Sequence, residues 1–103
     1  MSSPGTAGFL LTVGPGQPRF AACLESARRA RENGMEIFFY ALDDGVAALG
    51  DSRLAALSGP RFHVMGCAYA AERRGLARRP EYSYGGLKML GDLIAHTAEF
   101  HSF

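Results

Sequence analysis

The stretch that decides the fold runs from Arg61 to Gly75 and reads RFHVMGCAYAAERRG. It opens with an apolar run that is short enough to be a buried strand, and this run ends at Gly66. Cys67 follows at once, and strong helix formers come after it and end at two arginines and Gly75. The pattern predicts a strand over residues 61–66 and a helix over residues 67–74, with the cysteine at their junction.

Cys67 stands at a position that changes the chemistry of a thiol. The first N–H groups of a helix lack partners inside the helix, and the aligned peptide dipoles leave partial positive charge there. A thiolate is stabilised at such a position, which makes a cysteine nucleophilic near neutral pH. We therefore expect Cys67 to do the chemistry, against the alternative that it is a small buried hydrophobe.

Outward from this stretch, strand patterns and helix patterns alternate along the chain. Continuous apolar runs are typical of strands buried on both faces, and apolar side chains three and four residues apart are typical of amphipathic helices. The predicted strands cover residues 9–13, 35–42, 61–66 and 98–103, and the predicted helices cover residues 19–33, 46–57, 67–74 and 87–97.

Several local features refine these elements. Cys23 lies on the apolar stripe of the first helix and is predicted to be a core residue. Asp43 and Asp44 are predicted to cap the helix that follows them, and residues 50–52 are expected to interrupt that helix. Residues 76–86 are predicted to form a loop in which any further strand is very short.

Alternating strands and helices require parallel pairing through crossover connections. We therefore predict a single domain over residues 1–103, an α/β fold with a three-layer α/β/α sandwich and a mainly parallel sheet of four or five strands, as in flavodoxin-like or Rossmann-like folds. Residues 1–7 are expected to form a loose leader. Ligands in such sheets bind beyond the carboxyl ends of the strands, which is the edge where Cys67 is expected.

Composition limits the partners. The formal net charge is +1, so a nucleic acid is not an expected partner. The apolar run at residues 9–13 is too short for a membrane span, and the N-terminus lacks a signal pattern, so we expect a cytoplasmic protein that does not bind membranes. Apolar residues make up 48% of this small chain, which leads us to expect an oligomer.

Metal binding and phosphatase-type chemistry are two alternatives for these residues. The histidines have no partners at metal-ligand spacing, so we expect neither a metal nor a cofactor. Cys67 and Arg73 match the Cys-x5-Arg spacing of thiol phosphatases and arsenate reductases. In those enzymes the intervening residues form an anion-cradling loop, whereas residues 68–72 here favour a helix and include Glu72.

Two motifs resemble the DsrE/DsrF/TusD-like sulfur relay family. Residues 67–76, CAYAAERRGL, resemble its Cys-x-x-Ala-Ala-x-x-Arg-Gly segment, and residues 38–46 resemble its second strand and turn. The last helix and strand of the family are similar to residues 86–103. The resemblance therefore extends over nearly the whole chain.

This resemblance implies a small DsrEFH-like α/β/α protein that assembles as a dimer, trimer or hexamer, or with sister subunits. It implies that Cys67 accepts sulfane sulfur as a persulfide from a donor and hands it to an acceptor protein. Such a transfer requires an exposed thiol of low pKa and a mobile cover, for which residues 82–86 are the candidate. Some family members act only as scaffold or binding subunits, and this remains the alternative function. The residues expected to support an anionic sulfur are Arg73, Arg74, His63 and Tyr84.

Overall fold

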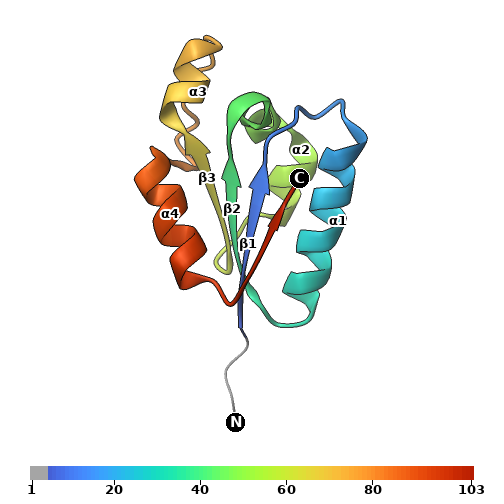
Figure 1. The fold of residues 1–103 in the computed structure, drawn as a ribbon. Coiled ribbons are helices and arrows are strands. Elements are labelled where there is room, and N and C mark those ends of the chain that lie inside the picture. The colour runs from blue at the N-terminus through green and yellow to red at the C-terminus, as the bar shows by residue number, and fades with distance from the viewer. Residues whose placement is uncertain (1–4) are drawn as a thin grey trace.

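The computed structural model describes residues 5–103 (Figure 1). Five parallel strands form one sheet in the order β4-β3-β2-β1-β5. The strands are β1 (Thr6–Leu11), β2 (Glu36–Ala41), β3 (Phe62–Cys67), β4 (Ser83–Gly85) and β5 (Glu99–Ser102). The helices are α1 (Pro18–Glu32), the 3-10 helix η1 (Asp43–Gly50), α2 (Ser52–Leu57), α3 (Ala68–Arg73) and α4 (Leu87–His96). The predicted α/β class is confirmed.

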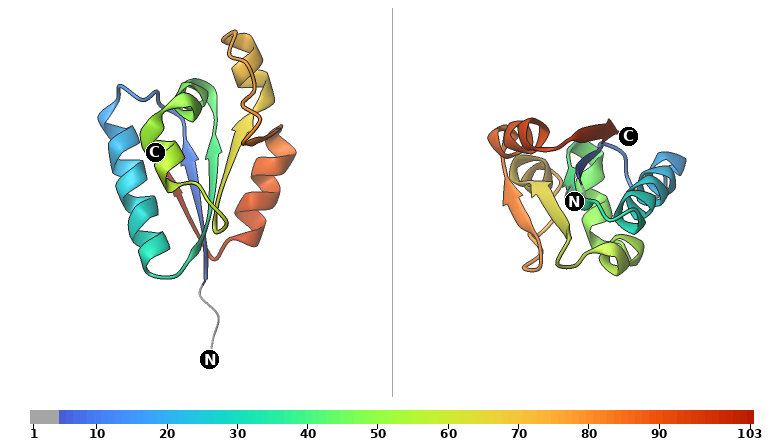
Figure 2. Two further views of the ribbon diagram at one scale, coloured as in Figure 1. Left: turned by 180° about the vertical axis from the view of Figure 1, so that it is seen from behind. Right: turned by 90° about the horizontal axis from the view of Figure 1, so that it is seen from below.

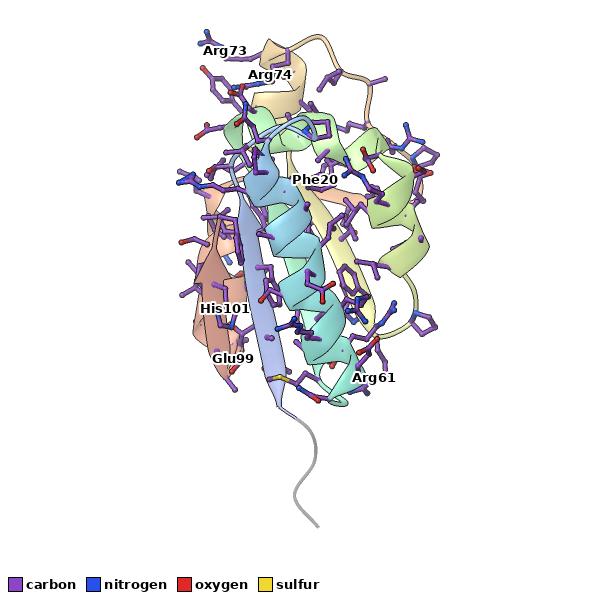
Figure 3. The ribbon with its side chains drawn as sticks, turned by 90° about the vertical axis from the view of Figure 1, so that its right-hand side faces the viewer. Phe20, Arg61, Arg73, Arg74, Glu99 and His101 are labelled. Atoms are coloured by element: carbon purple, nitrogen blue, oxygen red, sulfur yellow. The ribbon has the colours of Figure 1, made fainter. Side chains whose placement is uncertain are left out.

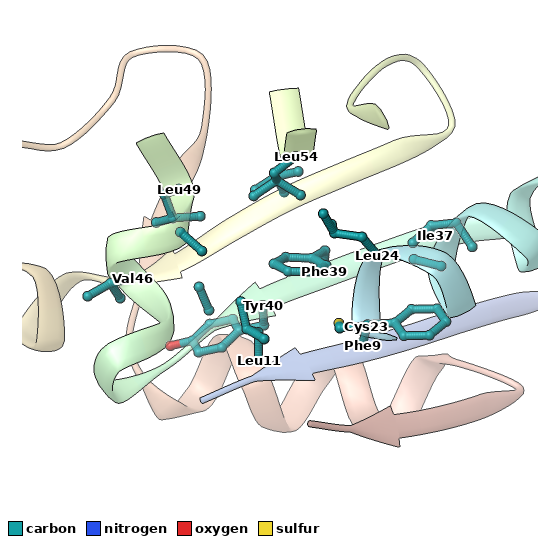
Figure 4. Packing of buried hydrophobic residues seen from close by; sticks show 14 of the residues in the cluster. Phe9, Leu11, Cys23, Leu24, Ile37, Phe39, Tyr40, Val46, Leu49 and Leu54 are labelled. Carbon is teal, nitrogen blue, oxygen red and sulfur yellow. The ribbon is translucent and has the colours of Figure 1, made fainter. Parts of the chain in front are cut away.

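Helices cover the two faces of the sheet unequally. Helices α1 and α2 lie on one face and α4 lies on the other (Figure 2). Phe9, Ile37 and Phe39 are fully buried in the core cluster, which α1 and α2 complete (Figure 4). Phe38 and Met65 face α4 and are only partly buried. The core therefore lies mainly on the α1 side of the sheet.

The apolar stripe of α1 packs as its spacing predicts. All five of its apolar side chains are buried: Phe20, Cys23, Leu24, Ala27 and Ala30. Cys23 has no exposed surface, and burial raises the pKa of its thiol to about 12. This thiol therefore stays protonated at neutral pH, and the interpretation of Cys23 as a core residue is confirmed.

The first strand begins earlier than the apolar run indicates. Thr6 and Ala7 pair with Glu36 and Ile37 of β2, and Ala7 is fully buried. These two residues belong to the sheet and not to a leader. Their place in the strand is set by backbone pairing with β2, which does not require large apolar side chains. The strand also ends earlier, at Leu11. Residues 1–4 of the predicted leader lie outside the described residues.

The turn after β2 does not use its aspartates as caps. The N-cap of η1 is Leu42, no side chain caps this helix, and Asp43 has a positive φ of 52°. Asp44 instead accepts hydrogen bonds from Arg74. The predicted cap was therefore wrong, since η1 begins at Asp43 itself and the Asp44 carboxylate binds Arg74. The predicted interruption is confirmed, and Asp51 caps α2 by accepting from the Arg53 N–H.

The predicted loop after α3 contains β4, which has only three residues. Met65, Gly66 and Cys67 of β3 pair with Ser83, Tyr84 and Gly85. A strand this short at the edge of the sheet is held by few backbone hydrogen bonds. No helix within residues 5–103 is both long enough and apolar enough to cross a membrane.

Candidate functional site

Cys67 is at once the last residue of β3 and the N-cap of α3. Its Sγ atom accepts a hydrogen bond from the Ala70 N–H at 3.4 Å. This is one of the N–H groups that a helix cannot satisfy internally, so the sulfur takes the role that an oxygen plays in an ordinary cap. The predicted strand-to-helix junction is thus present, with the thiol directed at the helix N-terminus.

The expectation of an exposed thiol was wrong, because only 4% of the surface of Cys67 is exposed. Gly85 of β4 pairs with Cys67 across the sheet edge, and Gly86 follows and caps α4. Both glycines lie within residues 82–86, the segment predicted to form a mobile cover. We therefore expect access to the sulfur to require a displacement of this segment.

Tyr40 is the residue that sequence reasoning missed. Its side chain is fully buried, and its hydroxyl lies 3.3 Å from the Gly85 carbonyl oxygen and 3.2 Å from that of Gly86, to which it donates. Burial first, and then the charge and hydrogen bond of Cys67, raise the pKa of the Tyr40 phenol. The phenol therefore stays protonated and keeps a donor between Cys67 and its cover.

One signal in the sequence could have found Tyr40. It is the polar-tipped residue within the apolar run 37–42, and buried tyrosine hydroxyls require a hydrogen-bond partner. The partners come from Gly85 and Gly86, more than forty residues away, so the pairing depends on the order of the strands.

The cover is also attached to α4. The Gly86 carbonyl oxygen accepts the Met89 N–H at 3.1 Å, as well as the Tyr40 hydroxyl. A Cβ added at Gly85 would lie 2.7 Å from the Met89 methyl carbon, so a larger residue there must displace that side chain. Tyr40 and the first turn of α4 together hold the segment that covers the thiol.

Arg73, the last residue of α3, and Arg74, its C-cap, bind groups other than the sulfur. The Arg73 guanidinium donates to the Tyr69 hydroxyl at 3.1 Å and lies over the Tyr69 ring. The Arg74 guanidinium donates to Asp44 at 2.9 Å and to the Ala70 carbonyl oxygen at 3.2 Å. In the described part of the chain neither has a hydrogen bond to Cys67.

His63 and Tyr84 also lie apart from the thiol. The ring of His63 stacks on Phe38 and its Nε2 atom lies 2.6 Å from a Glu36 carboxylate oxygen. His63 stands four residues before Cys67 on an extended strand, which separates the two by roughly 13 Å. A Cβ on Gly66 would meet the Tyr84 ring at 3.0 Å, so this ring lies on the face opposite the Cys67 side chain.

The conformation of residues 68–72 bears on the phosphatase alternative. These residues form most of α3, so their N–H groups do not converge on an oxyanion as they would in a Cys-x5-Arg loop. Within residues 5–103, no three side chains of His, Cys, Asp or Glu come together as a metal site would require. The site therefore consists of Cys67, Tyr40 and the Gly85–Gly86 backbone.

Comparison with solved structures matches the crystal structure of the ychN protein from E. coli. The TM-score is 0.83 at 17% sequence identity, and the match covers 96% of this chain and 99% of that chain. The chain therefore shares the fold of that protein, a five-stranded parallel sheet with helices on both faces. No family model matches the sequence, and no curated protein matches it.

Replacing Tyr40 by Phe should loosen the cover. The variant Tyr40→Phe keeps the buried ring and removes the hydroxyl that holds Gly85 and Gly86, a loss of about 1 kcal/mol. Amide hydrogen exchange in the peptide that spans residues 83–90 should accelerate by roughly fivefold, since each such bond contributes to local stability.

The control is Tyr84→Phe, which removes a hydroxyl from the same strand on the other face, where it accepts from the Arg79 N–H. This variant should leave the exchange of residues 85–90 close to that of the wild type. Equal exchange in Tyr40→Phe and the wild type would show that the hydroxyl does not hold the cover.

Proposed function

We propose that this chain carries sulfane sulfur as a persulfide on Cys67 and passes it to a thiol of a partner protein. The observation that carries the proposal is the position of Cys67, whose Sγ atom accepts the Ala70 N–H at the start of α3. The CAYAAERRGL segment and the DsrE-like fold support it, because the sulfur relay resemblance places its reactive cysteine at this point of the same fold.

The chemistry needs no cofactor of its own. The Cys67 thiolate attacks a sulfane sulfur atom of a polysulfide, the S–S bond of the donor breaks, and the donor leaves with the electron pair. An acceptor thiolate then attacks the outer sulfur of Cys67–S–SH. A new S–S bond forms on the acceptor, and Cys67 leaves as a thiolate, so the bound sulfur keeps its oxidation level.

The surroundings of Cys67 suit a persulfide, which must be stabilised by hydrogen bonds and kept from competing thiols. A persulfide anion needs hydrogen-bond donors, and the Ala70 N–H already donates to Sγ. The Tyr40 hydroxyl donates to the Gly85 and Gly86 carbonyl oxygens while that segment is in place, and movement of the segment would free it to donate to the sulfur. The Gly85–Gly86 segment excludes competing thiols while the sulfur is bound. Opening of this segment would then admit the donor and the acceptor in turn.

One observation favours the scaffold function as the alternative. Cys67 exposes 4% of its surface, and a thiol that stays covered cannot exchange sulfur. In that case the junction would serve only to join β3 to α3. The two functions differ in one property, which is whether Cys67 reacts in the folded protein.

Intact mass spectrometry after incubation with a polysulfide tests the proposal. The wild type should gain about 32 Da, one sulfur atom, and lose it again with dithiothreitol. Cys67→Ala should gain nothing, because it lacks the acceptor sulfur. Cys23→Ala should gain the same mass as the wild type, because the Cys23 thiol is buried and protonated.

An adduct that survives in Cys67→Ala and disappears in Cys23→Ala would contradict the proposal. Absence of any adduct in a folded wild type would favour the scaffold function.

We propose in addition that α4 packs against a second copy of the chain. Leu87 and Ile94 on α4 are 68% and 47% exposed. Between α4 and the sheet lies a groove of about 440 Å³, which Phe38, Met65 and Met89 line. Apolar surface of this kind on one side of a small domain is typical of a subunit contact.

Light scattering coupled to size-exclusion chromatography reports the assembly. The wild type should show a multiple of the 11.1 kDa chain mass, and the double variant Leu87→Glu with Ile94→Glu should shift toward one chain. A glutamate at the exposed Ala22 of α1 serves as the control and should leave the mass unchanged. A wild type that elutes as a single chain would overturn this assembly.

A further inference from the structure

Beyond Cys67 the chain forms an exposed projection, which we call the arginine arm and define as residues 68–81. The arm consists of α3 and the segment that leads to β4, and it stands beyond the carboxyl edge of the sheet (Figure 1). Residues 72–81 are exposed without interruption. Only Ala70 and Ala71 of the arm belong to the core, so packing does not explain the composition of its exposed part.

Positive charge is concentrated on this arm. It carries Arg73, Arg74, Arg78 and Arg79 against Glu72 and Glu81, a formal charge of +2 in a chain whose total is +1. Asp44 pairs with Arg74, and Glu81 pairs with Arg79. Among residues 5–103, no carboxylate forms an ion pair with Arg73 or Arg78, and these two guanidinium groups are available to a partner.

The arm also presents side chains that typically dominate protein interfaces. Tyr69 is 65% exposed and Leu76 is 39% exposed. The Arg73 guanidinium lies 5.8 Å from the centre of the Tyr69 ring and donates to its hydroxyl, while Arg78 lies 5.8 Å from the Tyr84 ring centre. These contacts order the arginines before binding, which lowers the entropy cost of an interface.

The location of the arm links it to the thiol. Helix α3 begins immediately after Cys67 and its six residues extend only about 9 Å. Arg73 and Arg74 lie at the far end of the molecule from Arg61 (Figure 3). A partner that binds the arm would therefore place a thiol of its own close to Cys67.

We infer that the arginine arm docks an acidic protein surface that surrounds the acceptor cysteine, an inference that rests on the proposed sulfur transfer. A second copy of this chain fits less well, because among residues 5–103 only Asp43 and Glu72 have no ion pair, and most of the other carboxylates are already engaged. Glu25 and Glu32 pair with Arg28, Asp51 pairs with Arg53, and Asp92 pairs with Lys88. A nucleic acid offers no thiol, and two free arginines are few for phosphate binding.

Cysteine peptides of three charges test the inference. The Cys67 thiol is first converted to its mixed disulfide with 5-thio-2-nitrobenzoate. Peptides with a central cysteine flanked by four Glu, four Gln or four Lys residues then attack Cys67 Sγ. Their thiolate sulfur forms the new S–S bond, and the coloured thiolate leaves with the electron pair. Each rate is divided by that of the same peptide with the glutathione mixed disulfide, which removes intrinsic differences between the peptides.

At about 20 mM salt the normalised rate should be highest for the Glu peptide, roughly fivefold above the Gln peptide, and lowest for the Lys peptide. About 500 mM salt should abolish the difference. The double variant Arg73→Gln with Arg78→Gln should lose the preference. Arg29→Gln with Arg61→Gln removes the same charge elsewhere and should retain it, since Arg29 lies exposed on α1 and Arg61 lies at the opposite end (Figure 3).

A second readout needs no reactive thiol. Fluorescence anisotropy measures binding of peptides in which serine replaces the central cysteine. Equal normalised rates and equal binding for all three peptides would overturn the inference. A second result would also overturn it. In that result the wild type shows no preference among the peptides, and the double variant Arg73→Gln with Arg78→Gln changes from an oligomer to a single chain. Neither readout uses a persulfide, so failure of sulfur loading at Cys67 is recognised separately by mass spectrometry.

Discussion

Strand β3 passes into helix α3 without a connecting loop, and the rest of the site depends on this constraint. One residue must end the strand and cap the helix, and that residue is Cys67. Its sulfur therefore lies where the helix presents an unpaired N–H group, which is the Ala70 N–H. The same junction carries α3 out beyond the sheet, so the arginine arm starts where the thiol lies.

The unequal covering of the two sheet faces makes the two cysteines differ in accessibility. On the α1 side the apolar side chains are fully buried and hold Cys23 in a protonated, unreactive form. On the other side α4 covers the sheet, and Cys67 pairs with the last residue of the three-residue strand β4, which Gly86 joins to α4. Two cysteines with similar exposure thus differ in what must move to reach them. Cys23 requires opening of the core, and Cys67 requires displacement of a segment that Tyr40 holds by one hydroxyl.

Much of this fold could be predicted from local patterns. The spacing of Phe20, Cys23 and Ala27 determines the face that α1 buries, and the run that ends at Gly66 places the junction within one residue. These features depend on residues that are close in sequence, so the spacing of the apolar residues predicts them. The start of β1 was misplaced because Thr6 and Ala7 are small and join the sheet only through pairing with β2 and β5.

The parts of the site that escaped prediction depend on long-range contacts. Tyr40 reaches Gly85 and Gly86 because β3 lies between β2 and β4, and no local pattern encodes that order. Asp44 was expected to cap a helix and instead binds Arg74, thirty residues away. A charged or polar side chain can form interactions of similar energy with several partners, so the tertiary structure decides which contact forms. Sequence spacing alone does not determine them.

The most direct test of the account compares the two thiols in one folded sample. Native protein is treated with iodoacetamide near neutral pH, quenched at intervals and digested, and the modification of each cysteine is quantified by mass spectrometry. The account predicts that Cys67 is modified at least ~100-fold faster than Cys23, because local opening of the cover is far more frequent than opening of the core. Modification of both cysteines at one slow rate, equal to that of global unfolding, would contradict it.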